Sequence, residues 1–263
     1  MKYIDQIGQT LEISKNPKRI ISLVPSQTEL IVDLGFQDAL VGITKFCVYP
    51  KHLRKTVTVV GGTKQVHLDR IQQLSPDIII ANKEENTQAI VNECSKIAPV
   101  WVSDIGNLKA AFSMIISLGE ILGNANRAQE IVSQIISHQQ AFRSEISIQQ
   151  SLEVAYVIWK NPYMVAGNDT FIHAMLEENG FKNSCQQQRY PEVTIQRLQE
   201  ADLILLSSEP FPFKKEDVIA LQKELKNPVL LVDGEFFSWY GTRLLGAFAY
   251  FSKLQIAVKK LLK

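Results

Sequence analysis

The sequence predicts an α/β protein of two similar lobes, each with a mainly parallel central sheet, joined by one long helix, with a ligand cleft between the lobes. Three observations support this fold. Strand-like apolar runs alternate with helical segments, and no strand is predicted over residues 107–146. Sequence segments of the first half also recur in the second half. The predicted boundaries are 1–123 for the N-terminal lobe, 124–148 for the connecting helix and 149–263 for the C-terminal lobe.

The N-terminal lobe begins with a short β-branched run at residues 19–24, which gives way to a helical pattern that ends at Gly35. A further helical stretch is predicted over 68–74. Strands that alternate with helices are typical of a parallel sheet. The other predicted strands of this lobe are residues 39–43, 57–60, 78–81 and 100–102.

The connecting helix is predicted from apolar residues that recur at helical spacing between Ala128 and Ile146, with Asn124 as a suitable N-cap. A helix from about residue 125 to 146 would span roughly 30 Å at 1.5 Å per residue. This length is sufficient to cross from one lobe to the other.

The C-terminal lobe restarts the pattern with a strand over 154–159, a loop, and a helix from about Thr170 to Glu178. The helix and strand at 68–80 are echoed at 194–205, and the strand at 98–104 is echoed at 227–233. Any doubly wound sheet can contain such similar strand and helix segments without a duplication. Matched units in the same order nevertheless favour two similar lobes.

Composition argues against several classes of protein. Lys and Arg total 28 against 27 Asp and Glu, so the chain lacks the basic stripe of a nucleic-acid-binding protein. The three cysteines are far apart, which fits neither a zinc ribbon nor a disulfide framework. No segment approaches about 18 uninterrupted apolar residues, and the N-terminus does not read as a signal peptide. We expect a monomer that binds no nucleic acid and spans no membrane.

Signatures of catalysis are missing from the sequence. It contains none of the motifs G-x-S-x-G, G-x-x-x-x-G-K-[ST], G-x-G-x-x-G or H-E-x-x-H, and its four histidines have no metal-ligand spacing. Residues 61–64 are a plain turn in the preferred interpretation, and Ser26 or Thr28 suits a helix N-cap better than a nucleophile. We therefore predict that the protein is not an enzyme, with no catalytic residue, no metal ligand and no intrinsic cofactor.

Candidate ligand contacts come from the loops after the strands, because ligands of parallel α/β sheets sit outside the carboxyl ends of the strands. Four aromatic residues lie within five positions of segment 234–243, where they can stack on a flat ligand. For Phe236 and Phe237 a buried cluster is an equal alternative. Glu84 and Glu85 suit either a cation or ligand amine, or a solvated turn. The predicted contacts are Pro25, Ser26, Tyr49, Gly62, Thr63, Lys83, Glu84, Trp159, Tyr190, Glu209, Phe237, Trp239, Tyr240 and Arg243.

Segments 5–13, 16–23 and 68–80 resemble the helical-backbone metal-receptor family, the substrate-binding proteins of ABC importers for vitamin B12, haem and iron-siderophores. The resemblance covers essentially the whole chain, and members that bind vitamin B12 are the most similar. It implies a small-molecule ligand, a corrinoid, haem or iron chelate, held without catalysis. It also implies that Tyr49, Tyr190 and Trp239 face this ligand.

Two departures from the family pattern bear on ligand and partner. Members that bind vitamin B12 place tryptophans in two loops of the first lobe, where this chain has Thr63 or Lys64 and Asn82. Members also dock on the importer permease through one acidic residue per lobe; Asp69 matches the first, but Gln196 stands at the second. The resemblance implies a periplasmic or cell-envelope location. Gln196 and the missing signal peptide leave a cytoplasmic corrinoid carrier or sensor as an alternative, and a metal-dependent hydrolase as a more remote one.

Overall fold

The structure is a computed structural model that describes residues 1–13, 16–146 and 152–262. They divide into two compact units. Unit 1 comprises Met1–Ile105, Lys109–Gln134 and Tyr240–Thr242. Unit 2 comprises Gly106–Leu108, Ile135–Trp239 and Arg243–Lys263. The boundary predicted between residues 148 and 149 lies outside the described residues.

Unit 1 contains a five-stranded sheet in the order β5-β4-β3-β6-β7, in which all neighbouring strands are parallel. Continuous apolar runs suit such a sheet because helices bury both of its faces. A hairpin of β1 (Lys2–Ile4) and β2 (Thr10–Glu12) forms a separate antiparallel sheet. The five strands are β3 (Ile20–Ser22), β4 (Leu40–Ile43), β5 (Thr58–Val59), β6 (Ile78–Asn82) and β7 (Val100–Ser103).

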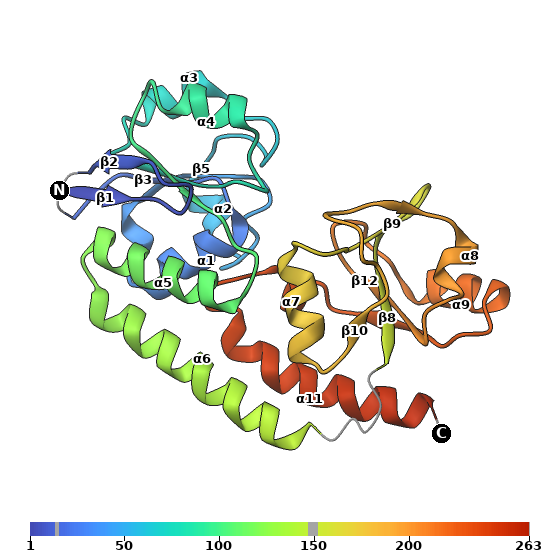
Figure 1. Ribbon diagram of the computed structural model, residues 1–263. Coiled ribbons are helices and arrows are strands. Elements are labelled where there is room, and N and C mark those ends of the chain that lie inside the picture. The colour runs from blue at the N-terminus through green and yellow to red at the C-terminus, as the bar shows by residue number, and fades with distance from the viewer. Residues whose placement is uncertain (14–15, 147–151, 263) are drawn as a thin grey trace. The chain divides into compact units, whose positions relative to one another are not determined.

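Helices cover both faces of this sheet (Figure 1). On one face, alternate strand residues such as Ile21 and Ile79 pack with Ile71 and Cys94 from two helices, α3 and α4. The helices α1 and α5 lie on the other face. The bounds are α1 (Pro25–Asp33), η1 (Gln37–Ala39), α2 (Leu53–Thr56), α3 (Leu68–Gln73), α4 (Gln88–Cys94) and α5 (Leu108–Leu122).

The start of α1 corrects one prediction, because neither Ser26 nor Thr28 caps this helix. Its N-cap is Val24, without a side-chain hydrogen bond, and Pro25 occupies the first turn. Proline suits that position because it lacks the N–H that would be left unbonded there. The Thr28 hydroxyl instead donates to Ser22 Oγ at 2.8 Å.

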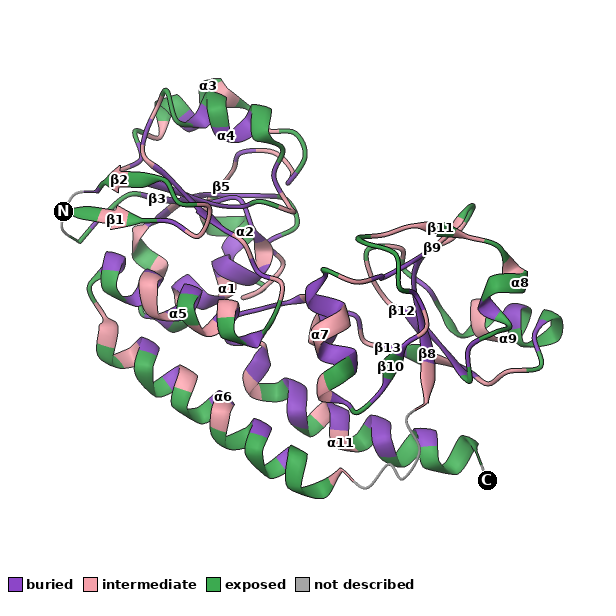
Figure 2. Ribbon diagram, in the orientation of Figure 1, coloured by how far each residue is buried: buried purple, intermediate pink, exposed green. Residues whose placement is uncertain are grey.

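The long helix α6 (Ala125–Glu145) begins where the sequence predicts. Asn124 caps it, since its Oδ1 accepts a hydrogen bond from the Arg127 N–H at 3.4 Å. The residues of α6 up to Gln134 belong to unit 1, and those from Ile135 belong to unit 2. Figure 2 shows buried and exposed residues alternating along the helix, as expected for an amphipathic pattern.

Unit 2 contains a six-stranded sheet with the order β11-β9-β8-β12-β13, and β10 pairs with β8 away from this path. The parallel neighbours β8, β12 and β13 repeat the arrangement of β3, β6 and β7 in unit 1. In contrast, β9 is antiparallel to β8, and β11 to β9. The bounds are β8 (Glu153–Trp159), β9 (Tyr163–Val165), β10 (Lys182–Asn183), β11 (Glu192–Val193), β12 (Leu203–Ser207) and β13 (Val229–Val232).

The sheet of unit 2 is also buried on both faces. Ala155 and Val157 pack with Leu198 of α8 and Leu221 of α9. On the other face the ring centroid of Tyr156 lies 4.9 Å from that of Phe237. The helices are α7 (Phe171–Glu178), α8 (Ile195–Leu198), α9 (Lys215–Glu224), α10 (Glu235–Ser238) and α11 (Leu244–Leu261).

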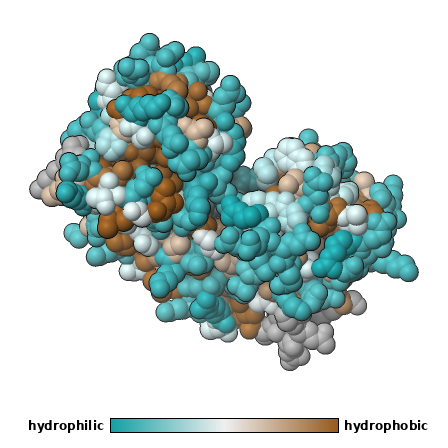
Figure 3. Space-filling model, turned by 45° about the horizontal axis from the view of Figure 1, so that its top comes forward, coloured by the Kyte–Doolittle hydropathy of each residue, from teal (hydrophilic) through white to brown (hydrophobic). Residues whose placement is uncertain are grey.

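The face of the molecule drawn in Figure 3 is mainly hydrophilic, with hydrophobic residues gathered in patches. Charged residues make up 21% of the chain, enough to cover much of such a surface. Among the helices of the described residues, none has the length and apolar character needed to cross a membrane.

Candidate functional site

The carboxyl ends of the parallel strands of unit 1 meet at one edge of the sheet, which we call the unit 1 edge. Hydrogen bonds join the loops that follow the strands. Asn86 Nδ2 donates to the Thr63 carbonyl oxygen at 2.9 Å, and Lys64 Nζ donates to the Glu84 carbonyl oxygen at 2.5 Å. Two predicted contacts, Pro25 and Ser26, lie in the first turn of α1, which follows β3. The predicted contacts in loops at this edge are Tyr49, Gly62, Thr63, Lys83 and Glu84.

A buried polar network holds the unit 1 edge together. Asn82, the last residue of β6, is 1% exposed, and its Nδ2 donates to Ser103 Oγ at the end of β7 at 2.9 Å. Its Oδ1 accepts hydrogen bonds from the Glu84 N–H at 2.9 Å and the Glu85 N–H at 3.0 Å. Gln27 Nε2, from α1, also donates to Ser103 Oγ. The Asn82 amide, which is hydrogen-bonded through both its nitrogen and its oxygen, fixes the positions of the loops.

Residues 61–66 form a tight turn, which confirms the plain turn preferred from the sequence. Gly61 and Val66 form an antiparallel bridge, and the Gly62 N–H donates to the Gln65 carbonyl oxygen at 2.7 Å. The φ angle of Gly61 is +133°, and a Cβ atom there would lie 2.5 Å from the Gln65 carbonyl oxygen. Only glycine fits this position.

Phe46 lies in the loop after β4 and is not among the ligand contacts predicted from the sequence. Its side chain is 49% exposed, and the ring centroid lies 5.1 Å from Lys45 Nζ. An aromatic residue next to a lysine in a strand-end loop is the signal that could have identified it.

The second of the two adjacent glutamates at this edge has a perturbed carboxyl group. Burial, and then the charge of Glu84, raise the pKa of Glu85, while Lys64 and a hydrogen bond with Thr63 act in the opposite direction. The pair lies in the turn after β6 that Asn82 holds. Within residues 1–13, 16–146 and 152–262, no group of three or more His, Cys, Asp or Glu side chains could hold a metal ion.

The carboxyl ends of β8, β12 and β13 form the corresponding edge of unit 2, the unit 2 edge. Trp159, the last residue of β8, is 41% exposed, and its ring meets Phe211 edge-on with centroids 5.5 Å apart. Glu209 follows β12, and its side chain accepts a hydrogen bond from Ser238 of α10. The structure therefore brings Trp159 and Glu209 to the same edge.

The aromatic segment 234–243 is only partly a loop, because residues 235–238 form the short helix α10. This helix turns Phe237 inward. Its ring is fully buried and lies 4.9 Å from both Tyr156 and Phe251, so Phe237 is a core residue and not the surface contact that we predicted. Phe236 stacks on Tyr250, with ring centroids 4.7 Å apart.

Trp239 and Arg243 form a compact polar and aromatic group with Glu235. The guanidinium carbon of Arg243 lies 5.1 Å from the centroid of the Trp239 ring, and Arg243 Nη2 lies 3.4 Å from Glu235 Oε2. The pKa of Glu235 is raised by burial, and the charge of Arg243 opposes this shift only in part. Tyr240 belongs to unit 1, unlike these three residues.

The backbone of Tyr190 does not lie at the unit 2 edge. The Val165 N–H donates to the Pro191 carbonyl oxygen at 3.1 Å, and the Ala166 N–H donates to the carbonyl oxygen of Tyr156, in the middle of β8. Tyr190 is thus level with the interior of the sheet. The Arg189 guanidinium lies 5.8 Å from its ring centroid.

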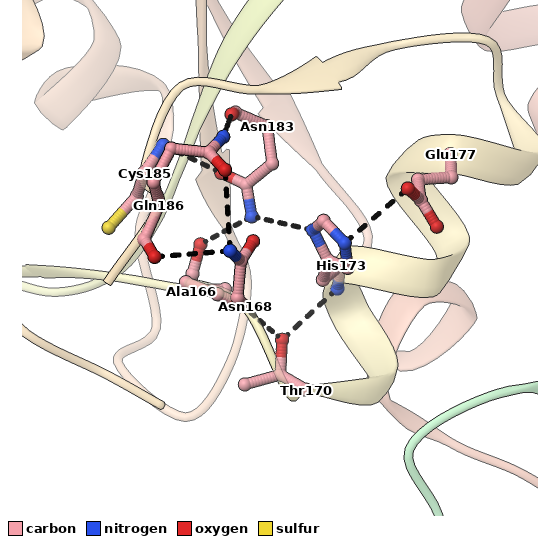
Figure 4. A network of polar contacts seen from close by, with 9 residues as sticks. Ala166, Asn168, Thr170, His173, Glu177, Asn183, Cys185 and Gln186 are labelled. Carbon is pink, nitrogen blue, oxygen red and sulfur yellow. Dashed lines mark hydrogen bonds and ion pairs between the residues drawn. The ribbon is translucent and has the colours of Figure 1, made fainter. Parts of the chain in front are cut away.

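A polar network in unit 2 fixes the segment before α7 against residues 183–186 (Figure 4). Asn183 Nδ2 donates to the Ala166 carbonyl oxygen at 3.0 Å and faces His173 Nδ1 at 3.2 Å. Because this amide nitrogen is a donor, His173 Nδ1 accepts, and its proton lies on Nε2, 3.5 Å from Glu177 Oε1. Thr170 caps α7 by accepting from the His173 N–H at 3.1 Å.

Asp69, the predicted docking residue, is exposed in the first turn of α3. It lines a surface hollow of about 670 Å³ beside α4. The corresponding position of unit 2, Gln196, is exposed in α8. The residues that line the hollow are Leu68, Asp69, Gln72, Ser75, Pro76, Glu93, Lys96 and Ile97.

Comparison with known proteins gives a match over most of the chain. A family model described as periplasmic binding protein matches residues 20–219. An uncharacterized ABC transporter substrate-binding lipoprotein of Bacillus subtilis is 28% identical over 193 residues, which are 70% of this chain and 60% of that protein. The matched part of the chain thus spans less than two thirds of that relative.

Solved structures share the fold. The periplasmic vitamin B12-binding protein of Vibrio cholerae has a TM-score of 0.81 at 20% identity, with 94% of this chain and 100% of that chain covered. A periplasmic haem-binding protein from Roseiflexus sp. RS-1 has a TM-score of 0.78 at 18% identity, with 94% and 99% covered. These similarities establish the fold and leave the ligand open.

Proposed function

The chain belongs to the periplasmic binding protein family, and from this premise we propose that it captures a corrinoid, a haem or an iron chelate and presents it to an ABC importer. The observation that carries the proposal is the aromatic side chains that end or follow strands in both units. Tyr49 follows β4 of unit 1, and Trp159 ends β8 of unit 2 and is 41% exposed. Trp239 follows α10 and is 8% exposed. Flat rings stack favourably on such side chains.

The polar groups of both edges support the same function. Lys83 and Glu84 lie in the loops of unit 1, and Glu209 and Arg243 belong to unit 2. A few placed charges beside aromatic surface can orient a bound ligand and give specificity. Tyr190 and Tyr240 remain part of the proposal as further contacts.

We also propose that the protein works as a monomer in the periplasm or cell envelope. The division into two lobes and a connecting helix, as predicted from the sequence, is part of this proposal. Asp69 is the proposed contact with the importer, because an exposed carboxylate beside a hollow suits a basic group of a permease. Gln196 supplies no matching charge in unit 2. This asymmetry favours the second candidate, a cytoplasmic carrier or sensor of corrinoids that needs no importer.

Titration of the purified protein with cyanocobalamin, dicyanocobinamide and hemin, followed by visible absorption, tests the proposed function. We expect a saturable spectral change with at least one of the three. Trp239→Ala should weaken that binding by about tenfold, as removal of a stacking ring does. Ile219→Ala, which changes an apolar residue of α9 that is 59% exposed, serves as the control. No spectral change with any of the three at tens of micromolar would contradict the corrinoid and haem versions of the proposal.

A further inference from the structure

We propose that Lys45 and Phe46 form a ligand subsite of unit 1 that favours a flat ring bearing carboxylates over the same ring with its carboxylates amidated. The inference rests on the proposed function and adds the ligand chemistry that the unit 1 edge recognises. Three features of these two residues lead to it.

The first feature is the support of the Phe46 ring on one side. A Cβ atom built on Gly62 would lie 3.2 Å from Phe46 Cε2 and 3.4 Å from Lys45 Cε, so both side chains lie against the turn at residues 61–62. The ring nevertheless remains 49% exposed. A ring supported by backbone and half-open to solvent offers a surface on which a planar ligand can stack.

The second feature is the charge beside this ring. Lys45 Nζ lies 5.1 Å from the Phe46 centroid, and in the described part of the chain Lys45 takes part in no ion pair. Lys64 and Lys83, in the loops after β5 and β6, have polar partners. Lys83 Nζ lies 2.5 Å from Asp104 Oδ2, and Lys64 Nζ bonds to a carbonyl oxygen. Lys45 therefore places beside the Phe46 ring an ammonium group that no carboxylate of the described residues pairs with.

The third feature is the state of the nearby carboxyl groups. Asp104 is engaged by Lys83, and burial favours the neutral form of Glu85 by raising its pKa. These two groups therefore repel a ligand carboxylate less than two unpaired, ionised carboxylates would. A ring with peripheral carboxylates can stack on Phe46 while a carboxylate approaches Lys45. An amidated ring can only stack.

The test compares dicyanocobyrinic acid, whose ring carries carboxylates, with dicyanocobinamide, whose ring carries amides. Lys45→Met keeps the length of the side chain and removes its charge. We expect it to weaken binding of the acid by about threefold to fivefold, the size of an exposed ion pair, and to leave the amide within about twofold. Phe46→Ala should weaken both ligands by about tenfold, because both stack.

Matched controls are Lys253→Met and Ile219→Ala, which alter an exposed lysine of α11 and an exposed isoleucine of α9. Both should leave both affinities unchanged. If the wild-type protein binds either ring and Lys45→Met and Phe46→Ala bind it equally well, the subsite is wrong while the proposed function stands. An equal loss for both ligands in Lys45→Met would overturn the selection for carboxylates. If the wild type binds neither these rings nor hemin, the corrinoid and haem versions of the proposed function fail, and the subsite fails with them.

Discussion

Asn82 holds the unit 1 edge through both ends of its amide. Its nitrogen donates to Ser103 Oγ and to the Ser103 carbonyl oxygen, and its oxygen accepts from the N–H groups of Glu84 and Glu85. Aspartate lacks the donor and leucine lacks both functions. This requirement explains why an amide, instead of a tryptophan, follows Ala81 here. The residue serves the geometry of the loops around it.

Glu85 makes the stability of the protein depend on pH. Its pKa is raised above 4.5, first by burial and then by Glu84. Folding therefore becomes less favourable as the pH rises from below 4.5 through the higher folded-state pKa, because the folded protein resists ionisation of this group. We expect Glu85→Gln to raise the melting temperature near neutral pH. The gain should shrink as the pH falls from the folded-state pKa towards 4.5.

The measurement is thermal unfolding followed by circular dichroism across this pH range. Glu120→Gln, at an exposed position of α5, provides the control and should show no such pH-dependent gain. A Glu85→Gln variant that melts below the wild type near neutral pH would show that the ionised carboxylate stabilises the fold.

At the scale of elements, the sequence predicted the parts that repeat and missed those without a repeated pattern. The helix and strand at 68–80 form α3 and β6, and their counterparts at 194–205 form α8 and β12. Each of these strands lies between two parallel neighbours. The antiparallel strands β9 and β11 were missed because they are only three and two residues long. Runs this short show no period.

The strand-end loops were predictable in place, but the orientation of their side chains was not. Strand-end loops can be located from apolar runs, since a parallel sheet gathers them at one edge. Whether a ring in such a loop points out or in depends on local backbone, as with Phe237, which the turn of α10 buries. Phe46 is the opposite case, because only the packing against Gly62 distinguishes it as a supported, exposed ring.

The turn between β13 and α10 yields a prediction about glycine. A Cβ atom on Gly234 would lie 2.3 Å from Ser207 Oγ and 2.6 Å from Glu209 Cγ. Gly234→Ala must therefore displace the ends of β12 and α10. We expect a loss of about 1–3 kcal/mol in the free energy of unfolding, as in other overpacked sites. Urea unfolding measures this loss, and Gly106→Ala, where a Cβ meets nothing within 4 Å, is the control. Equal stability of both variants would mean that the turn yields easily.

For the whole molecule, two sheets of the same central order put two sets of strand-end loops into one chain. Each sheet has a hydrophobic core of its own, around Ile79 in unit 1 and around Val157 in unit 2. The segment Tyr240–Thr242 belongs to unit 1 although its neighbours in sequence belong to unit 2. Duplication of one arrangement thus gives each unit its own strand-end edge, and the two edges differ in their side chains.

If the ligand draws on both sets of loops, its effect should reach both units. A ligand that binds only the folded state at about 100 times its Kd adds about 2.7 kcal/mol of stability, which corresponds to a rise of roughly 5–10 °C in the melting temperature of a chain of this size. Amide hydrogen exchange, measured with the ligand that binds in the titration, should show added protection of the backbone at residues 44–50 and 61–64 of unit 1. Protection is expected as well at 207–211 and 234–243, which lie mostly in unit 2. Protection in the loops of one unit alone would instead place the whole binding site on a single sheet. Trp239→Ala, measured with the ligand at the same concentration, should lose the added protection at 234–243 first, because its stacking surface is gone.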